Sequence, residues 1–587
     1  MRMPPPTCHP WRPNANGLRH AVAAGHQLSA QTGMQILEAG GNAVDAGVAA
    51  CLVTAVVESQ MTGIAGINPI FIRLNTGETI ASSGIGPWPM AASCEYFQKR
   101  HGGRIPNNYE EAIVPGALGT LVAILGRHGT MSFADVAHQA TRFARDGFPM
   151  YPLMARHIRE RIEKLKRWPG SYAISTQNGR LVEAGDKFVQ ADLGRTLQYL
   201  IDEEKAALKK GNRKAGLKAA HDAFYKGDIA AAVIAHHSQN ESLMTREDLA
   251  AYEADIHPGV STTWRDITIS SGSTGGLHTL MLYNLMDGID VAKMGHNSVD
   301  YIHTLTEAVK IVMADREAYI GDPAFVDTPV KAMLDKAFAA KRRAHIDPEK
   351  AYPGFPPSGA QLGEGPAAIR DRTMGSPATG GGGSTRAAAR GPGDLATSIV
   401  CVIDENDNVF TGLPSGSFLD SPMVPGTGIA ISGYGKLSSA DPNHPNCVAP
   451  GKRPRCLYPA IASRPDGMLF PFGSPGSDVI PQATLQVFLN VFVFGMDPQS
   501  AVEASRFASY SFPQPFEPHD ILDRVLRIEG GVADVTGLEL ERMGHRVEWW
   551  PKRDWLAASV CCILKDPDTG YLYGGADPRR SAWAVGF

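Results

Sequence analysis

The feature that most constrains how this chain can fold is a low-complexity segment that ends abruptly before a threonine. Residues 353–394 are crowded with Gly, Pro, Ala and Arg, and residues 380–383 are four consecutive glycines. This composition predicts an exposed linker that cannot build a packed core. Residues 397–404 follow with a run of β-branched and apolar side chains that begins at Thr397. Because the run is apolar nearly throughout, it predicts a strand covered on both faces.

A cut between Ala396 and Thr397 would create a threonine with a free α-amine beside its own hydroxyl. Such an amine can act as the general base for the hydroxyl. Its pKa is ~7.7–8.0, so an appreciable fraction is unprotonated at neutral pH. The pattern is therefore typical of a self-cleaving N-terminal-nucleophile enzyme. The alternative interpretation is a surface linker that precedes an ordinary buried strand.

Size and charge exclude several other classes. With 587 residues and 43% apolar side chains, the chain can bury a large core. A formal net charge of −4 gives no indication of a nucleic-acid partner or of an anionic membrane. The longest apolar run, residues 43–57, contains Asp45 and is too short to span a bilayer. Since no secretory signal begins the sequence, we expect a cytoplasmic protein without membrane or nucleic-acid partners.

The sequence also lacks the common signatures of metal and cofactor sites. The eight cysteines show no CxxC spacing, and the 18 histidines show no metal-ligand spacing. No phosphate-binding loop, HExxH motif or nucleophile elbow occurs. We therefore predict neither a metal nor a cofactor.

Local signals predict alternating helices and strands. Residues 27–39 have helical spacing and end at two glycines, and a second helix starts at Asn42 or Ala43 and runs to Val57. Residues 69–74 predict a strand, and Ser298 is a plausible N-cap of a long helix. Residues 397–404 and 409–413 flank a short polar turn and predict a β-hairpin.

Many short motifs occur in the order that one protein family shows. They lie at residues 40–46, 114–116, 224–227, 274–278, 314–323, 425–429, 451–454, 473–476 and 576–579. With them, the chain resembles the gamma-glutamyltransferase (gamma-glutamyltranspeptidase) family of N-terminal-nucleophile hydrolases over about residues 17–587. Each motif alone is weak, and their number and order carry the resemblance.

The resemblance implies a fold of the α+β class, a four-layer αββα sandwich. It implies autoproteolysis into a large subunit, residues 1–396 with a flexible linker at about 353–394, and a small subunit, residues 397–587. The two pieces would remain associated as a heterodimer. Thr397 matches the nucleophile of the family, and Ser415 stands where the family has a second threonine that bonds it. Gly476 and Ser477 match paired glycines whose N–H groups receive the oxyanion, although Gly476 alone could be an ordinary turn glycine.

The substrate pocket departs from the family pattern. The loop at residues 82–89 lacks the arginine with which the family holds the α-carboxylate of a γ-glutamyl group. Ser417 replaces an asparagine, and Tyr434 and Leu437 replace the Gln and Asp that bind the substrate's α-amino group. Arg455 either supplies a relocated carboxylate clamp or is an ordinary surface arginine. The groups that bind an amino-acid head group are thus mostly lost.

The resemblance therefore implies a self-processing threonine amidohydrolase or acyltransferase that works through an acyl-enzyme ester. Its substrate is a small-molecule amide with a gamma-glutamyl-like or other small acyl group. Two alternatives stay open at this point: a catalytically inactive member that serves as a binding scaffold, and a hydrolase of a non-amide bond in small-metabolite biosynthesis.

Overall fold

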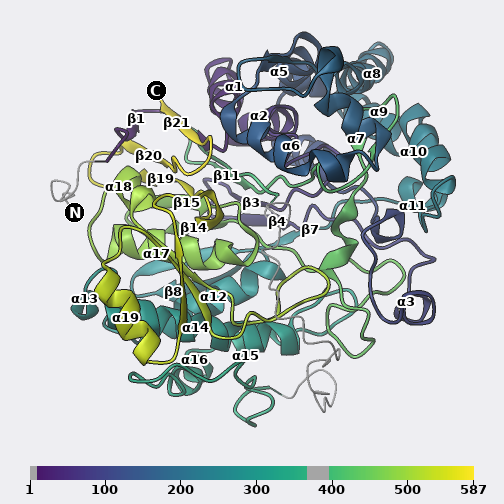
Figure 1. The fold of residues 1–587 in the computed structure, drawn as a ribbon. Helices are drawn as coiled ribbons and strands as arrows, with labels where there is room; N and C mark the ends of the chain where they lie inside the picture. Colours follow the sequence, from purple (N-terminus) through teal and green to yellow (C-terminus); the bar gives the residue numbers. More distant parts are fainter. Residues whose placement is uncertain (1–9, 367–395) are drawn as a thin grey trace.

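Two seven-stranded antiparallel sheets form the centre of the molecule (Figure 1). The computed structural model describes residues 10–366 and 396–587. The first sheet has the order β21 (Trp583–Gly586), β2 (Ala21–Ala24), β10 (Val400–Ile403), β11 (Val409–Gly412), β3 (Ile70–Arg73), β4 (Thr79–Ser82) and β7 (Ile256–Pro258). The second has the order β1 (Ala15–Gly17), β20 (Leu572–Ala576), β19 (Cys561–Lys565), β15 (Leu469–Gly473), β14 (Ala460–Ser463), β9 (Ile267–Ser271) and β8 (Val260–Trp264).

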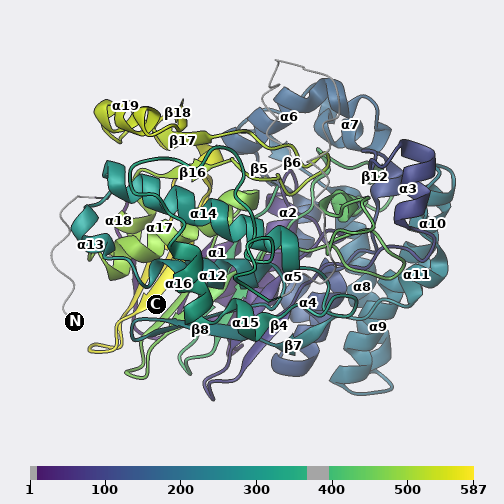
Figure 2. The same ribbon diagram turned by 90° about the horizontal axis from the view of Figure 1, so that it is seen from below.

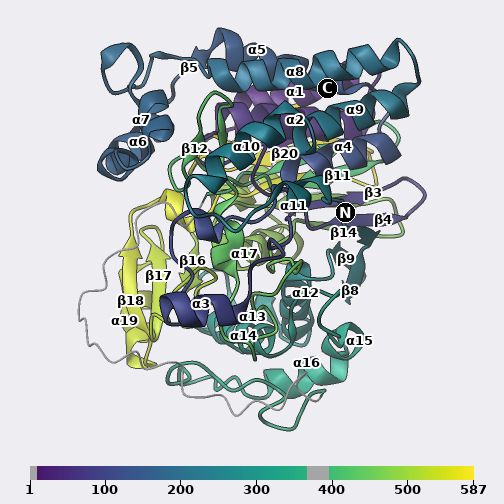
Figure 3. The same cartoon turned by 90° about the vertical axis from the view of Figure 1, so that its right-hand side faces the viewer.

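Helices cover the outer face of each sheet, as Figure 3 shows from the side. The layer over the first sheet contains α1 (Gln27–Glu38), α2 (Ala43–Val57), α4 (Ala117–His128), α5 (Phe133–Asp146), α8 (Ala191–Leu208) and α9 (Arg213–Tyr225). The layer over the second contains α12 (Gly275–Met286), α14 (Val299–Tyr319), α16 (Lys336–Arg343), α17 (Ile480–Phe492) and α18 (Pro498–Glu503). The predicted αββα sandwich of the α+β class is therefore confirmed.

Three hydrophobic cores fill the spaces between these four layers. Strand β10 shows how they divide: Val400 and Val402 point into the core beneath α2, whereas Cys401 and Ile403 point into the core between the sheets. The third core lies between the second sheet and its helices and includes Phe470 and Phe472 of β15. Both faces of β10 are buried, which explains its nearly continuous apolar sequence.

The remaining elements lie around this sandwich. A three-stranded sheet of β16 (Phe507–Ser509), β17 (Val525–Glu529) and β18 (Arg546–Trp550) packs beside α19 (Asp534–Arg542) at one side of the molecule (Figure 2). The smaller helices are α3 (Cys94–His101), α6 (Pro152–Leu165), α7 (Pro169–Ser175), α10 (Asp228–Ser238), α11 (Arg246–Ala250), α13 (Val291–Met294) and α15 (Val330–Met333). Two short ribbons pair β5 (Phe148–Pro149) with β6 (Lys187–Phe188) and β12 (Met423–Val424) with β13 (Ile429–Ala430).

Local hydrogen bonds set the helix starts that the sequence predicted. Asn42 caps α2 and forms a reciprocal capping box with Asp45, and Ser298 caps α14. All fifteen residues of α2 are buried. A Cβ on Gly47 would lie 2.1 Å from the ring of Phe410, and this helix can therefore approach β11 only through glycine. No helix among the described residues is long and apolar enough to cross a membrane.

The first part of the predicted linker is packed against the protein. Gly359 donates its N–H to Asp315 of α14 at 2.7 Å, and the carbonyl of Pro357 accepts a hydrogen bond from Arg342 of α16 at 2.9 Å. Tyr319 donates its hydroxyl to the carbonyl of Pro366 at 2.8 Å. Residues 353–366 are thus held by hydrogen bonds that composition does not reveal. The rest of the predicted linker, up to residue 394, lies outside the described residues.

Candidate active site

The hairpin of β10 and β11 places Thr397 opposite Ser415. The register pairs Val400 with Gly412, and Ser398 continues it by donating its N–H to the carbonyl of Pro414 at 2.8 Å. One further residue on each side brings Thr397 and Ser415 face to face. Ser415 is itself fixed by a pair of backbone hydrogen bonds with Ile67, at 2.8 and 2.9 Å.

A chain of hydroxyl groups leads to the carbonyl of Ala396. The Ser415 Oγ donates to the Oγ1 of Thr397 at 2.7 Å, and the Thr397 hydroxyl donates to the Ala396 carbonyl. Thr397 is half-buried, and both of these hydroxyl residues line one pocket. Arg580 donates to the carbonyl of Thr397 at 3.4 Å, so the backbone of this residue is held as well.

Gly476 and Ser477 form a turn between β15 and α17 in which both residues have a positive φ. The values are 134° for Gly476 and 56° for Ser477, and Ser477 lines the pocket. Among the described residues, no acceptor pairs with the main-chain N–H of either residue. A serine at φ 56° occupies a conformation that glycine adopts more easily, which fits its place in a predicted pair of glycines.

The pocket around Thr397 is mainly apolar. It contains four of the sequence-predicted site residues besides Thr397: Ser415, Ser477, Tyr434 and Arg455. Its full lining is Ile67, Pro69, Gly275, His278, Arg316, Ala396, Thr397, Leu413, Ser415, Tyr434, Leu437, Arg455, Cys456, Leu457, Ser477, Asp478, Ile480, Pro515 and Phe516. Burial raises the pKa of the Tyr434 phenol, and its hydrogen bond with Ser415 offsets part of that rise.

The charged groups of this pocket neutralise one another. Arg455 contacts Glu317 at 2.7 Å and donates to the carbonyls of Arg316 and Ile320. Arg316 contacts Glu317 and Asp478, each at 2.6 Å. Burial alone would raise the pKa of Glu317, but the charges of Arg455 and Arg316 hold it well below its usual value. Arg455 is therefore not an exposed surface arginine, and its guanidinium already has an anionic partner.

His278 differs from the other polar groups of the pocket. This residue of α12 is 2% exposed, and neither of its ring nitrogens has a hydrogen-bond partner among the described residues. Burial and the nearby charges of Arg316 and Arg455 lower its pKa well below the usual value, so the imidazole is neutral. This histidine lies in the family motif at residues 274–278, but no functional role was predicted for it from the sequence.

Ser417 lies outside this pocket. Its hydroxyl donates to the carbonyl of Gln60 at 2.7 Å and accepts from the N–H of Leu419 at 3.0 Å. It lines a second, separate cavity with the loop at residues 62–66. Ser417 therefore supports this loop and lies away from the predicted substrate pocket.

A buried carboxyl group lies directly behind the candidate nucleophile. Glu58, at the C-terminal end of α2, accepts a hydrogen bond from the hydroxyl of Ser398 at 2.5 Å. Burial raises the pKa of Glu58 to about 7, although the Ser398 hydrogen bond and the charge of Arg580 both lower it. Nothing in the sequence pattern distinguished this glutamate.

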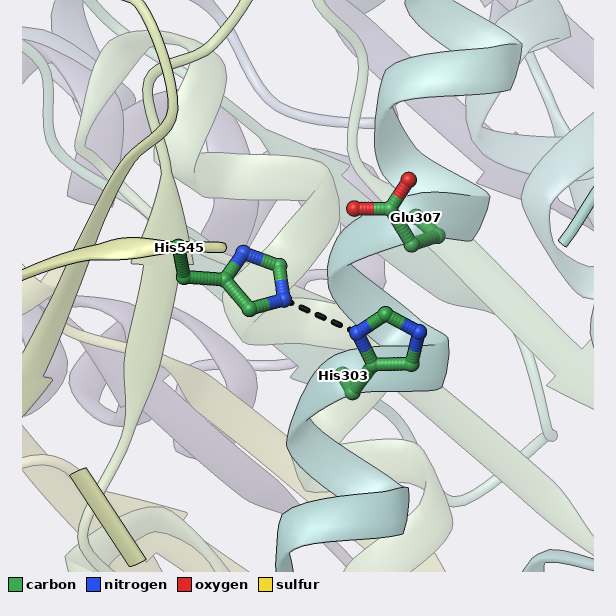
Figure 4. A group of neighbouring side chains, drawn as sticks. All are labelled: His303, Glu307 and His545. Atoms are coloured by element: carbon green, nitrogen blue, oxygen red, sulfur yellow. Dashed lines mark hydrogen bonds between the residues drawn. The ribbon is translucent and has the colours of Figure 1, made fainter. Parts of the chain in front are cut away.

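One cluster elsewhere has the residue types of a metal site (Figure 4). His303 and Glu307 of α14 lie beside His545, with ligand atoms within 4.8 Å of one another. The two imidazoles are hydrogen-bonded at 2.9 Å, and the other nitrogen of His303 donates to the Asp347 carbonyl. Glu307 is paired with the buried ammonium of Lys310 at 2.7 Å. A cation would have to share its only carboxylate with that ammonium, so the cluster fits a hydrogen-bonded structural role better than metal binding.

Comparison with known proteins agrees with this geometry. The profile of the Gamma-glutamyltranspeptidase family matches residues 29–587. The chain is 29% identical over 581 residues to the glutathione hydrolase-like YwrD proenzyme of Bacillus subtilis (strain 168), covering 97% of this chain and 99% of that relative. It is 29% identical over 587 residues to the acylase ACY 1 proenzyme of Pseudomonas sp. (strain SE83), covering 97% and 94%.

A solved structure shows the same fold. The cephalosporin acylase from Bacillus halodurans superposes with a TM-score of 0.81 at 24% identity, and the match covers 99% of each chain. The family match spans most of the sequence and includes every residue of the pocket. The chain therefore belongs to the gamma-glutamyltranspeptidase family and is an N-terminal-nucleophile amidohydrolase.

Proposed function

We propose that this protein is a self-processing threonine amidohydrolase that cleaves amides of small, neutral acyl groups. The observation that carries the proposal is the hydroxyl chain from Ser415 through Thr397 to the carbonyl of Ala396. It places the candidate nucleophile beside the one peptide bond whose cleavage would free its amine. The names of similar proteins, a glutathione hydrolase-like proenzyme and an acylase proenzyme, support both the amide chemistry and a precursor form.

Self-cleavage would begin with attack of the Thr397 Oγ1 on the carbonyl carbon of Ala396. A C–O bond forms, the C–N bond to Thr397 breaks, and the hydroxyl proton passes to the leaving nitrogen. Water then hydrolyses the resulting ester, which gives a carboxylate on Ala396 and restores the hydroxyl of Thr397. The second product begins with Thr397 and carries a free α-amine.

The same groups would then act on the substrate. The α-amine of Thr397 accepts the hydroxyl proton while Oγ1 attacks the substrate amide, and the proton passes to the departing amine. Water hydrolyses the acyl ester, or a second amine takes the acyl group. The N–H groups of Gly476 and Ser477, which have no acceptor among the described residues, are suited to receive the oxyanion of each tetrahedral intermediate.

The sheet order explains how the two products would stay together. In the first sheet, β10 and β11 from the C-terminal piece lie between β2 and β3 of the N-terminal piece. In the second, β14 pairs with β9 across the same division. Separation would break the antiparallel pairings of β2 with β10 and β21, of β3 with β11, of β9 with β14 and of β1 with β20, and it would expose the core between the sheets. We therefore infer a stable heterodimer of residues 1–396 and 397–587.

The pocket favours a neutral acyl group over a γ-glutamyl group. Both of its arginines are paired with carboxylates, and no residue of the loop at 82–89 lines it. A buried carboxylate without a free cationic partner is strongly disfavoured. Leu437, Leu457 and Phe516 instead present apolar surface to the substrate. The substrate class is thus a small-molecule amide whose acyl part carries no net charge.

Intact-mass measurement of the purified protein tests self-processing. We expect the wild type to give two chains, the lighter beginning at Thr397, and the Thr397→Ala variant to remain uncut and inactive. Thr411→Ala is the matched control, because it removes a buried threonine hydroxyl of β11 that donates to the carbonyl of Phe71. An uncut wild type, or a Thr397→Ala protein cut at the same bond, would contradict the proposal.

A second variant tests the hydroxyl chain. Ser415→Ala removes the hydrogen bond to Thr397 and should lower kcat for a neutral acyl anilide about tenfold. Ser415→Thr keeps a hydroxyl at this position and should recover most of that loss. Equal activity in Ser415→Ala and the wild type would show that this hydrogen bond does not assist the nucleophile.

A further inference from the structure

The first turn of α12 forms one wall of the substrate pocket. Gly275 and His278 are three residues apart, so they share a helix face, and both line the pocket with Thr397. Side chains of a helix lean toward its N-terminus, which directs the imidazole of His278 over this first turn. A Cβ on Gly275 would lie 1.7 Å from the carbonyl of Cys456, so only glycine allows this approach.

The imidazole of His278 has unused hydrogen-bonding capacity. It is 2% exposed, and both ring nitrogens lack a partner among the described residues. A neutral imidazole offers one donor and one acceptor. Buried polar groups in proteins nearly always have partners, and an exception that faces a pocket indicates a place for a ligand. The helix N-terminus adds N–H groups and a positive partial charge on the same side.

We propose that His278 and the N-terminus of α12 form a specificity subsite that binds an uncharged oxygen-bearing group of the acyl moiety, such as a ketone or a hydroxyl. This inference rests on the proposed function, since it describes the far end of the same acyl group. An oxygen acceptor suits both the imidazole N–H and the helix N–H groups. A carboxylate does not fit as well, because Arg316 and Arg455 are already paired with Glu317 and Asp478.

Three matched anilides test the subsite: pentanoyl, 4-oxopentanoyl and 3-carboxypropanoyl. For the wild type we expect kcat/KM to be at least about tenfold higher for the 4-oxopentanoyl compound than for the other two. In His278→Leu, the ratio between the 4-oxopentanoyl and pentanoyl compounds should fall to about one. His278→Gln keeps a hydrogen-bonding group and should restore part of the ratio. His138→Leu, which changes an exposed histidine of α5, should leave the ratio at its wild-type value.

The possible failures are distinguishable. A wild type that prefers the pentanoyl or the carboxylate compound would overturn the neutral oxygen-binding subsite, and so would an unchanged ratio in His278→Leu. A processed wild type that hydrolyses none of the three would contradict the proposed substrate class, and the subsite would fall with it. Intact mass shows whether His278→Leu still processes, and its melting temperature should not fall, because the substitution removes a buried polar group that lacks a described partner.

Discussion

We expect the carboxyl group of Glu58 to make the free energy of unfolding depend on pH, and Glu58→Gln to remove this contribution. Glu58 contacts Ser398, the residue after the proposed nucleophile, and is 1% exposed. Its environment includes the hydroxyl of Ser398, the charge of Arg580 and the phenol of Tyr151. Burial disfavours the ionised form enough to raise the pKa to about 7 from a reference of 4.5. Glutamine has the shape of the protonated acid and can still accept the hydrogen bond from Ser398.

The sign and size of the effect follow from linkage. Because the folded-state pKa exceeds the unfolded one, the protonated group favours folding fully below about pH 4.5, and this contribution is lost as pH rises to about 7. Each pKa unit corresponds to about 1.4 kcal/mol, so the whole shift amounts to about 3 kcal/mol. The wild type should therefore lose about 3 kcal/mol relative to Glu58→Gln between these pH values.

Urea unfolding of both proteins in a Thr397→Ala background measures this difference. That background keeps each protein as one chain under the proposed mechanism, and intact mass verifies it. We expect the difference in unfolding free energy between the two proteins to change by about 3 kcal/mol between about pH 4.5 and about pH 8. Glu111→Gln provides a matched comparison, since burial also raises the pKa of Glu111 to about 7 at a separate position. Parallel pH profiles for the proteins with and without Glu58→Gln would refute the reasoning.

Two further substitutions test the geometry. Ser477→Gly should raise the melting temperature slightly, because it relieves a positive φ that costs a non-glycine residue about 1 kcal/mol. Ser477→Val, which introduces a β-branched side chain, should lower the melting temperature. A lower melting temperature for the glycine variant would contradict the strained turn. Glu529→Gln should lower stability by about 3–5 kcal/mol, since it removes the carboxylate that contacts the buried Arg579 at 2.5 Å and leaves Arg579 and Arg506 to share Asp577. The control is Glu539→Gln, which removes the carboxylate of an exposed pair with Arg542 and should change the free energy of unfolding in urea little. Equal losses of stability at both positions would contradict the importance of burial.

The sequence predicted those elements whose ends depend on local chemistry. The capping box of Asn42 and Asp45 and the N-cap at Ser298 use hydrogen bonds within three residues, so a short window contains the whole signal. The order of the sheets is different. Val400 pairs with Ala24, which lies far away in the sequence, and only the resemblance to a known family predicted such an arrangement. The packed residues 353–366 were likewise missed, because Gly- and Pro-rich composition does not report tertiary hydrogen bonds.

The candidate site likewise contains residues that the sequence predicted and residues that it missed. The resemblance predicted a site made of Thr397, Ser415, Gly476, Ser477, Ser417 and Tyr434, with Arg455 as either a carboxylate clamp or a surface arginine. The structure places Thr397, Ser415, Ser477, Tyr434 and Arg455 at one pocket. The resemblance did not predict that Ser417 would instead bond the carbonyl of Gln60, or that Glu317 would occupy the guanidinium of Arg455. These outcomes depend on which side chains meet in space. His278 and Glu58 were missed for the same reason, since burial gives each of them its chemical character.

One part of the site could have been derived from the hairpin alone. A turn at residues 405–408 pairs Ile403 with Val409, and the same register carried outward places Thr397 opposite Ser415. Thr397, the proposed nucleophile, and its hydroxyl partner Ser415 are therefore held by the first sheet. His278, Arg316 and Asp478 come instead from α12, α14 and the turn before α17, which cover the second sheet. Because these side chains and Thr397 come from different layers, we expect substitutions at His278, Arg316 or Asp478 to change which acyl group is accepted while the β10–β11 hairpin still positions Thr397.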